Sequence, residues 1–218
     1  MPTEMQDTRT GAPLEILTEG HGADTVVYQT HPMWTPGMEH FVFQSTRESN
    51  FAQPFAREMA TGNVARLSHD QAHDWTLARK HDRFYYRVKQ RLYVRRVAEA
   101  FGAPETPQCV GEFDEFNRFE SSRMSIDALE DRLYVAVCIH KGREWGIGMV
   151  DLTSLSWHMV CTVDFRVGHV QANPLAAGLI MFCHETGGDA PQRMWVVDAK
   201  HGEPRPFYAE SYDEWVTH

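Results

Sequence analysis

Two arginines and a histidine stand out for their chemistry in this chain of 218 residues. A guanidinium group binds a carboxylate through two parallel hydrogen bonds, so Arg143 and Arg193 are candidate carboxylate clamps. An arginine on the surface of a sheet is the simpler alternative. His184 and Glu185 begin like a zinc-protease motif, but Gly188 stands where the second histidine is needed, which excludes that site. His184 is therefore a candidate substrate-binding residue or simply the end of a strand.

His169 and Gln171 form a second group of candidate residues. His169 follows Gly168 and begins a β-rich run, and Gln171 lies two residues further. Alternate residues of a strand share a face, so Gln171 could orient a substrate or the histidine. The alternatives are a histidine hydrogen-bonded within its own sheet and a buried amide that binds the backbone at a strand end.

A cluster of cationic side chains lies near the middle of the chain. It contains Arg87, Lys89, Arg91, Arg95 and Arg96. Such a cluster could attract a polyanionic sugar. The simpler interpretation is a solvated hairpin, because apolar residues alternate on both sides of a predicted turn at 89–90.

Short β-rich runs that recur along the chain must position these side chains. They are Phe41-Val42-Phe43, Phe84-Tyr85-Tyr86, Leu133-Tyr134-Val135 and Ile180-Met181-Phe182. Each is followed by a second strand candidate and a polar or glycine-bearing turn, with a period of roughly 40 to 50 residues, the length of one propeller blade. We therefore predict an all-β fold, a β-propeller of four-stranded blades with about four to five blades present. An irregular β-sandwich is the alternative.

The predicted blades cover about 30–67, 74–110, 124–162 and 169–208, within a single domain spanning 1–218. Propellers commonly close with more blades, so we expect a partial or open propeller: a fragment, a truncated product or a piece completed by another chain. A further strand is expected near 14–17, and 68–80 is either one or two helical turns or a loop. In this fold His169 can point toward the central channel.

Composition limits the classes of partner. The net charge of −9 argues against nucleic-acid or anionic-membrane binding, and an anionic substrate would need a local cation, either a metal or an arginine. The N-terminus lacks a secretory signal, and the longest apolar run, 175–183, is too short to span a bilayer, so we expect a cytoplasmic protein. The four cysteines show no zinc-type spacing and are expected to be reduced strand residues.

Three segments of the second half resemble one blade of the oligogalacturonate lyases. They are Gly168-His169-Val170-Gln171-Ala172-Asn173-Pro174, Met181-Phe182-Cys183-His184-Glu185-Thr186-Gly187-Gly188 and Gln192-Arg193-Met194-Trp195-Val196-Val197-Asp198. The ending Glu214-Trp215-Val216-Thr217-His218 is similar to the start of the next blade of that family. His31-Pro32-Met33-Trp34-Thr35-Pro36, followed by Phe41 to Arg47, resembles a strand motif shared with TolB-type propellers and marks only the fold.

The resemblance implies a seven-bladed propeller that cleaves oligogalacturonides by β-elimination with a divalent metal such as manganese. His169 falls on the family's candidate base and His218 on a metal ligand. A base removes the C5 proton of a uronate only when the adjacent carboxylate is neutralised by a metal or an arginine, which makes Arg143 a second candidate catalytic residue. The family's other ligands, a Gln and two His, would lie on a later blade. We therefore expect this chain alone to hold no stable metal ion.

Two functions are compatible with these observations. The first is an impaired or incomplete oligogalacturonate lyase, with His169 and Arg143 as catalytic residues and Gln171, His184 and Arg193 binding substrate. The second is a non-catalytic propeller segment that serves in binding or assembly. The expected partner is an acidic oligosaccharide, with no nucleic acid and no membrane, and uncovered blade faces would favour self-association.

Overall fold

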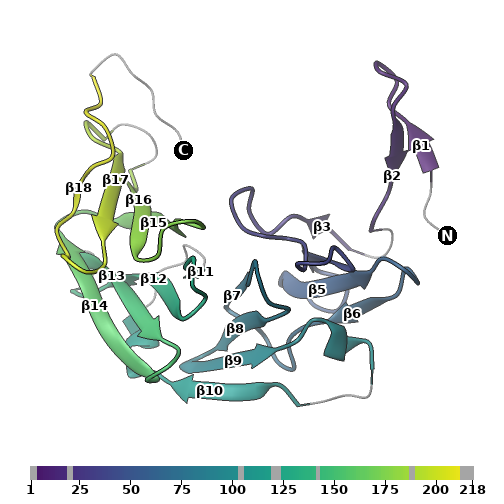
Figure 1. The fold of residues 1–218 in the computed structure, drawn as a ribbon, viewed down its shortest axis with the longest axis horizontal. Helices are drawn as coiled ribbons and strands as arrows, with labels where there is room; N and C mark the ends of the chain where they lie inside the picture. The colour runs from purple at the N-terminus through teal and green to yellow at the C-terminus, as the bar shows by residue number, and fades with distance from the viewer. Residues whose placement is uncertain are drawn as a thin grey trace.

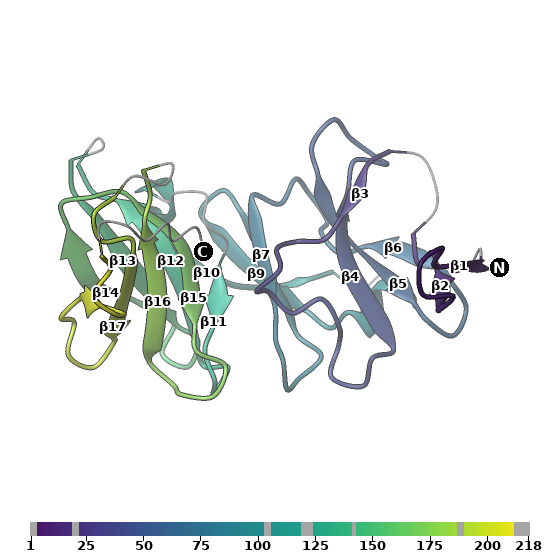
Figure 2. The ribbon, with the colours of Figure 1, turned by 90° about the horizontal axis from the view of Figure 1, so that it is seen from above.

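In the computed structural model, the residues described are 4–18, 22–102, 106–118, 124–140, 143–186 and 190–211. They form four antiparallel four-stranded sheets and one short N-terminal hairpin. The sheets stand side by side in an open arc, with the hairpin projecting from one end (Figures 1 and 2). The predicted propeller of four-stranded blades is confirmed, with four blades present, and the sandwich alternative is excluded.

Within each sheet the strands follow one another as a meander. The first sheet contains β3 (Asp24–Thr25), β4 (His40–Ser45), β5 (Gln53–Glu58) and β6 (Val64–Arg66). The second contains β7 (Asp74–Leu77), β8 (Phe84–Val88), β9 (Arg91–Arg95) and β10 (Gln108–Glu112). The third contains β11 (Ser125–Ile126), β12 (Arg132–Cys138), β13 (Trp145–Asp151) and β14 (Ser156–Val163). The fourth contains β15 (Val167–Ala172), β16 (Leu179–His184), β17 (Met194–Asp198) and β18 (Arg205–Pro206).

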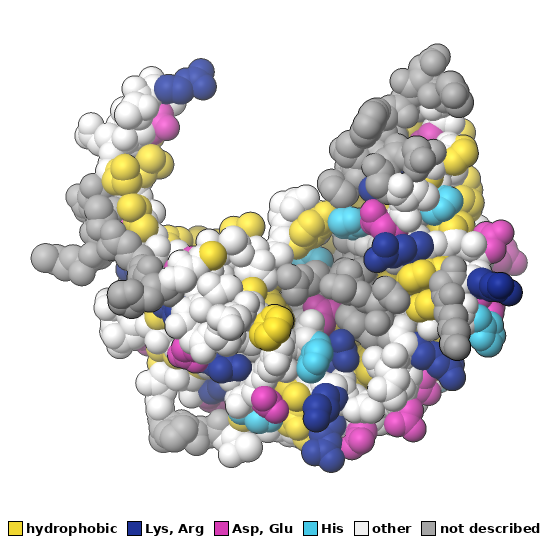
Figure 3. All heavy atoms as spheres, turned by 180° about the vertical axis from the view of Figure 1, so that it is seen from behind, with side chains coloured by type: hydrophobic (Ala, Val, Ile, Leu, Met, Phe, Trp, Pro, Cys, Tyr) yellow, Lys and Arg dark blue, Asp and Glu magenta, His cyan; other side chains and the backbone are white. Residues whose placement is uncertain are grey.

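The remaining elements are small. The hairpin pairs β1 (Glu4–Gln6) with β2 (Pro13–Glu15), so a strand does form near the expected 14–17. Two 3-10 helices, η1 (Ala98–Ala100) and η2 (Asp114–Arg118), are the helical elements of the described residues, and neither could cross a membrane. The side chains on the rear face carry interspersed charges of both signs along the rim (Figure 3).

Three apolar cores lie between neighbouring sheets. Val42 and Trp75 belong to the core between the first and second sheets, and Tyr85 and Leu133 to the core between the second and third. Tyr134 and Phe182 belong to the core between the third and fourth. A single blade cannot cover both faces of its own sheet, so this stacking buries the apolar residues that each strand carries.

The segment 68–80 was predicted as a helical turn or a loop, and both predictions miss a strand. β7 occupies 74–77 and is the innermost strand of the second sheet, with all four residues buried. A strand covered on both faces shows no polar and apolar alternation, which removes the sequence signal. The predicted turn at 89–90 is confirmed, since Val88 pairs with Arg91 and Lys89 has a φ of 52°.

The innermost strands of the four sheets, β3, β7, β11 and β15, line the inner side of the arc (Figure 1). Strands of successive sheets therefore bring residues that are far apart in sequence to one central region. The candidate site lies there.

Candidate functional site

His169 lies on a β-bulge in β15. Gly168 pairs with Cys183 and Gln171 with Met181, so His169 and Val170 both stand opposite Phe182 alone. His169 has a φ of 50°, a left-handed conformation that costs a non-glycine residue about 1 kcal/mol. Bulges turn a side chain out of the regular alternation of a strand. Here the bulge directs the imidazole to groups outside its own strand.

Both ring nitrogens of His169 have partners. Nδ1 lies 2.8 Å from the hydroxyl of Tyr28, which follows β3 in the first sheet. Nε2 lies 3.1 Å from Oε2 of Glu185, at the end of β16. Oε1 of Glu185 is 3.8 Å from the guanidinium of Arg193, whose side chain is buried. The His169 cluster, defined as Tyr28, His169, Glu185 and Arg193, thus joins the first and fourth sheets across 141 residues of sequence.

Gly168 allows Glu185 to take this position. A Cβ atom at residue 168 would lie 2.4 Å from Oε2 of Glu185, so the carboxylate rests on the backbone of β15 where a side chain would otherwise be. The backbone N–H of Glu185 also donates to the carbonyl of Arg166, over 2.8 Å. Gly168 therefore leaves the space that the Glu185 carboxylate occupies when it contacts His169.

Tyr28 is positioned by a second histidine. The ring of His31 meets Tyr28 edge to face, with centroids 5.9 Å apart. Nε2 of His31 lies 3.2 Å from the carbonyl oxygen of Met124, which precedes β11 of the third sheet. Burial raises the pKa of the Tyr28 hydroxyl, and the nearby Cys183 and Glu185 raise it further. Through His31, a backbone group next to the third sheet thus supports the position of Tyr28.

The expectation that Gln171 and His169 share a face relied on regular alternation, and a bulge interrupts the register between them. Gln171 pairs with Met181, and His169 belongs to the bulge opposite Phe182. Gln171 is half-buried in β15. Its role in substrate binding stays a prediction, without the geometric support of a shared face.

The other predicted site residues lie outside the central contacts. The His184 ring stacks on Phe165, with centroids 4.3 Å apart, a packing role at the end of β16. Arg143 is exposed on the turn between β12 and β13, and its backbone N–H donates to His140. His218 falls outside the described residues.

A metal site is not formed by the part of the chain that the structure describes. No group of three or more His, Cys, Asp or Glu side chains within 4–18, 22–102, 106–118, 124–140, 143–186 and 190–211 lies close enough to hold an ion. Protein metal sites draw several ligands into a fixed geometry. These residues therefore do not fit the divalent ion that the resemblance implies.

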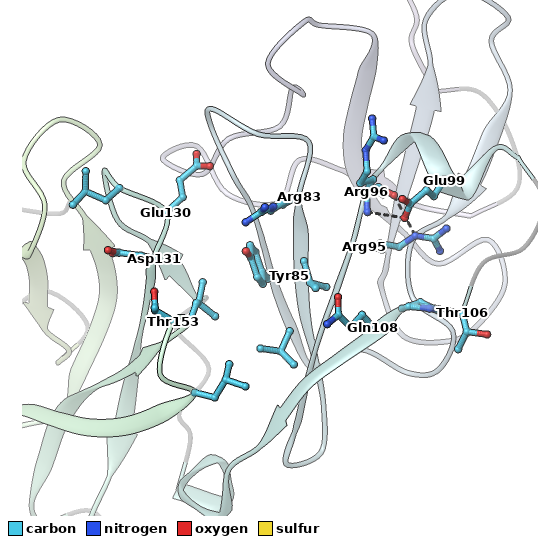
Figure 4. A pocket seen from close by; sticks show the side chains of 16 residues that line it. Arg83, Tyr85, Arg95, Arg96, Glu99, Thr106, Gln108, Glu130, Asp131 and Thr153 are labelled. Atoms are coloured by element: carbon cyan, nitrogen blue, oxygen red, sulfur yellow. Dashed lines mark hydrogen bonds between the residues drawn. The ribbon is translucent and has the colours of Figure 1, made fainter.

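A separate cleft of about 730 Å³ lies between the second and third sheets. Arg83 and Tyr85 project from the second sheet toward Glu130, Asp131 and Thr153 of the third (Figure 4). The carboxylate of Glu130 is already engaged, because it accepts hydrogen bonds from the backbone of Arg79 and Lys80 and from the ring of His81. Apolar side chains also line the cleft, among them Val94, Val110, Leu129, Leu152 and Leu155.

Part of the cationic cluster of the second sheet lines this cleft. Arg95 and Arg96 line it, whereas Arg87 is buried. Lys89 and Arg91 line a smaller pocket of about 440 Å³ at the other end of the same hairpin. The five cations therefore do not form one surface.

Sequence reasoning missed Tyr28 and Glu185. Glu185 left a signal, because it follows His184 directly, and neighbouring strand residues point to opposite faces. Tyr28 left none, since only the packing of the sheets brings it to His169.

Comparison with solved structures shows the same architecture. An oligogalacturonate lyase in complex with manganese superposes with a TM-score of 0.79 at 14% identity, over 97% of this chain and 60% of that one. The oligogalacturonate lyase of Vibrio parahaemolyticus gives a TM-score of 0.82 at 14% identity, over 100% and 61% of the two chains. This chain shares the fold of these lyases. TolB from Acinetobacter baumannii is less similar, with a TM-score of 0.61 at 10% identity, over 96% and 50%.

The resemblance inferred from the sequence motifs is therefore supported at the level of fold. The chain spans about 60% of the length of the two lyase structures. No family model matches the sequence, and no curated protein matches it.

Proposed function

We propose that this chain binds an acidic oligosaccharide of the oligogalacturonide type on the inner side of the arc and acts on it by lyase-type β-elimination. The observation that carries the proposal is the His169 cluster, in which a bulge turns a histidine out of its strand and a carboxylate orients its ring. An oriented imidazole is suited to proton transfer near neutral pH. The fold shared with the lyases supports the same reaction class.

The elimination begins with removal of the C5 proton of a uronate, and His169 or a group that it activates takes that proton. The bond from C4 to the glycosidic oxygen then breaks, and a double bond forms between C4 and C5. The uronate carboxylate needs a cation to make C5 acidic. Arg143 stays our proposal for that cation; it is exposed on the turn between β12 and β13, so its side chain would have to reach the substrate from outside the His169 cluster.

We propose that manganese is not held stably by this chain alone, because the described residues offer no ligand set. A longer protein that contains this chain could supply further ligands, as could an assembly.

The test is a spectrophotometric lyase assay. Digalacturonate and trigalacturonate are incubated with the chain, with manganese or with a chelator, and the ultraviolet absorbance of the unsaturated product is followed. We expect a slow rise that His169→Ala reduces by at least about 100-fold, the lower bound of a general base contribution. His201→Ala, at an exposed turn, is the matched control. A flat trace from folded wild-type protein contradicts the proposal.

The cleft between the second and third sheets favours a second candidate function, non-catalytic binding of an acidic sugar. Arg83 and Arg96 are exposed at its edge, and its floor is aliphatic with Tyr85 in the middle. Sugar rings pack on such apolar surfaces while arginines bind their carboxylates.

Calorimetric titration with trigalacturonate separates the two candidates. Binding that Arg83→Gln weakens at least about tenfold, but His169→Ala does not, would assign the sugar to the cleft. Loss of one bidentate contact to a charged group corresponds to about 1.4 kcal/mol or more. Arg205→Gln, on the exposed edge strand β18, is the matched control. Equal binding by all variants would exclude the cleft.

We also propose that the chain is cytoplasmic and that it self-associates through the faces at the two ends of the arc. Phe51 and Met38 are more than half exposed in the loops of the first blade, and Leu175 and Phe207 in the loops of the fourth. Apolar side chains of this size favour contact with a second copy. Light scattering after size exclusion would give the mass, and a monomer at micromolar concentration would contradict self-association.

A further inference from the structure

The hydrogen bonds of the His169 cluster have a direction. A carboxylate only accepts hydrogen bonds, so Nε2 of His169 carries the proton that is donated to Glu185 over 3.1 Å. In a neutral imidazole the other nitrogen then has a lone pair. Nδ1 accepts the hydroxyl proton of Tyr28 over 2.8 Å. The order is carboxylate, imidazole, hydroxyl.

This order is the one that activates a hydroxyl group. In catalytic triads the imidazole takes the hydroxyl proton, and the carboxylate fixes the tautomer and stabilises the imidazolium that forms. Such arrangements are recognised by geometry and by roles. In this protein the hydroxyl is the Tyr28 phenol, and Nδ1 of His169, the nitrogen suited to act as a base, faces that phenol.

We propose that Tyr28 is the catalytic residue that exchanges a proton with the substrate, and that His169 and Glu185 act behind it as a relay. The inference rests on the proposed function in one respect, that the substrate is a uronide. Tyr28 is half-buried in the segment that follows β3, the innermost strand of the first sheet. Arg193, at the other end of the relay, is buried and holds Glu185.

Tyr28 and His169 return to their starting protonation states at the end of the elimination. The C5 proton moves to the Tyr28 oxygen as the hydroxyl proton of Tyr28 moves to Nδ1 of His169, which leaves a neutral phenol and an imidazolium next to Glu185. The C5–H electron pair forms the C4–C5 double bond, and the glycosidic oxygen leaves with its bonding electrons. That oxygen takes the hydroxyl proton of Tyr28 as Nδ1 returns its own proton to the phenolic oxygen. Because the two transfers are coupled, no free tyrosinate forms at a hydroxyl whose pKa is raised by burial and by Cys183 and Glu185.

Two neighbours hold the phenol in place. Tyr28 packs against the edge of His31, and His31 is anchored to the backbone of Met124 in the third sheet. The ring of His169 lies tilted against the ring of Tyr28, with centroids 5.4 Å apart. These contacts orient the hydroxyl toward Nδ1 before any substrate binds, which reduces the cost of alignment.

The first test needs no activity. Nitrogen-15 NMR of histidine-labelled protein reports the tautomer of His169 at pH 8. We expect a protonated Nε2 and a hydrogen-bonded, unprotonated Nδ1, and we expect Glu185→Gln to shift this equilibrium. A protonated Nδ1 would overturn the relay, because His169 would then donate to Tyr28 instead of accepting from it.

The second test compares variants in the lyase assay. We expect Tyr28→Phe to lower kcat at least about 100-fold with KM changed less than about threefold, because the ring that packs in the site remains. Tyr93→Phe, which removes a hydroxyl on β9 of the second sheet, is the matched control. If Tyr28→Phe keeps the wild-type kcat while His169→Ala loses it, this inference fails and the proposed function stands.

An inactive wild-type chain and an unfolded Tyr28→Phe variant each lead to a separate test. If the wild-type chain has no lyase activity, the proposed function fails, and the tautomer alone decides whether the relay exists. If Tyr28→Phe does not fold, 3-fluorotyrosine at position 28 replaces it, because fluorination keeps the hydroxyl and makes it more acidic. The pH profile of kcat should then move to lower pH, and an unchanged profile would overturn the role of Tyr28.

Discussion

The second and fourth sheets each pair an acid with an arginine beside the innermost strand, and the two pairs differ in what surrounds them. Asp74 of β7 pairs in register with Arg87 of β8, and both are buried, at 1% and 8% exposure. Glu185 and Arg193 of the fourth sheet lie 3.8 Å apart, with the Glu185 side chain 24% exposed and in contact with His169. The Asp74–Arg87 pair is buried, whereas Glu185 of the second pair also contacts His169 at the inner side of the arc.

The innermost strands explain this difference. β7 pairs with β8 in unbroken register, and its four residues are all buried. β15 contains a bulge, and His169 in that bulge adopts a left-handed conformation. Strained residues that the surrounding structure maintains are concentrated at functional sites. The regular register of β7 keeps its acid enclosed, whereas the bulge of β15 carries His169 to contacts at the inner side of the arc.

Removal of the enclosed acid should have the largest effect. Asp74→Ala leaves the Arg87 cation buried without its facing carboxylate, so we expect a loss of about 3 kcal/mol of unfolding free energy. Glu185→Ala should cost about 1 kcal/mol or less, because its pair is longer and partly solvated. Urea unfolding followed by tryptophan fluorescence measures both. Equal losses would show that the two pairs do not differ as the structure indicates.

A methyl group at residue 168 should change the geometry of the His169 cluster at a small cost in stability. Gly168→Ala pushes the Glu185 carboxylate away from His169, since the new Cβ would lie 2.4 Å from Oε2. We expect a loss of about 1 kcal/mol together with a changed His169 tautomer in the NMR spectrum. Gly102→Ala is the control, because nothing lies within 4 Å of its Cβ position. An unchanged His169 signal would mean that Glu185 does not set the tautomer.

Buried thiols and phenols should make the fold sensitive to alkaline pH. Burial raises the pKa of Cys161 and Cys183 to about 11, and that of Tyr86 and Tyr134 to about 12. Below pH 9 these groups are neutral in both folded and unfolded chains, so their contribution to stability is complete. Between pH 9 and 12 the unfolded chain ionises first, at about 1.4 kcal/mol per unit of pKa difference.

The urea midpoint should therefore fall as the pH rises above 9. Cys183→Ala should reduce the slope by removing one group of the fourth sheet, while Cys109→Ala, at an exposed position in the second, should not. A midpoint that stays constant from pH 8 to 11 would contradict the burial of these groups.

Manganese should have the smallest effect. Because the described residues offer no ligand set, we expect millimolar manganese to change the melting temperature by less than about 1 °C relative to a chelator. Differential scanning fluorimetry measures this shift. A rise that increases with manganese concentration would show that ligands exist elsewhere in the chain.

Part of the molecule could be predicted from residues alone. The runs around Phe43, Tyr85, Tyr134 and Met181 lie in β4, β8, β12 and β16, the second strand of each sheet, where aromatic and β-branched residues face the cores. The innermost strand of the second sheet was harder, because β7 is short and all four of its residues are buried. β7 escaped prediction for that reason.

Of the four residues of the His169 cluster, His169 and Arg193 were selected from the sequence, whereas Tyr28 and Glu185 were not. His169 was selected from its motif, but its partners depend on the bulge and on the closure of the sheets around one region. The expected link from Gln171 to His169 relied on regular alternation, which a one-residue insertion in the register removes.

What the sequence by itself determined is the repeating pattern of strands and turns, because that pattern depends on residues that are close along the chain. The tertiary structure alone decided that Tyr28 meets His169 across 141 residues and that Glu185 rests on Gly168. Those contacts depend on how successive sheets pack, and packing follows from the summed shapes of the three cores rather than from any local run of residues.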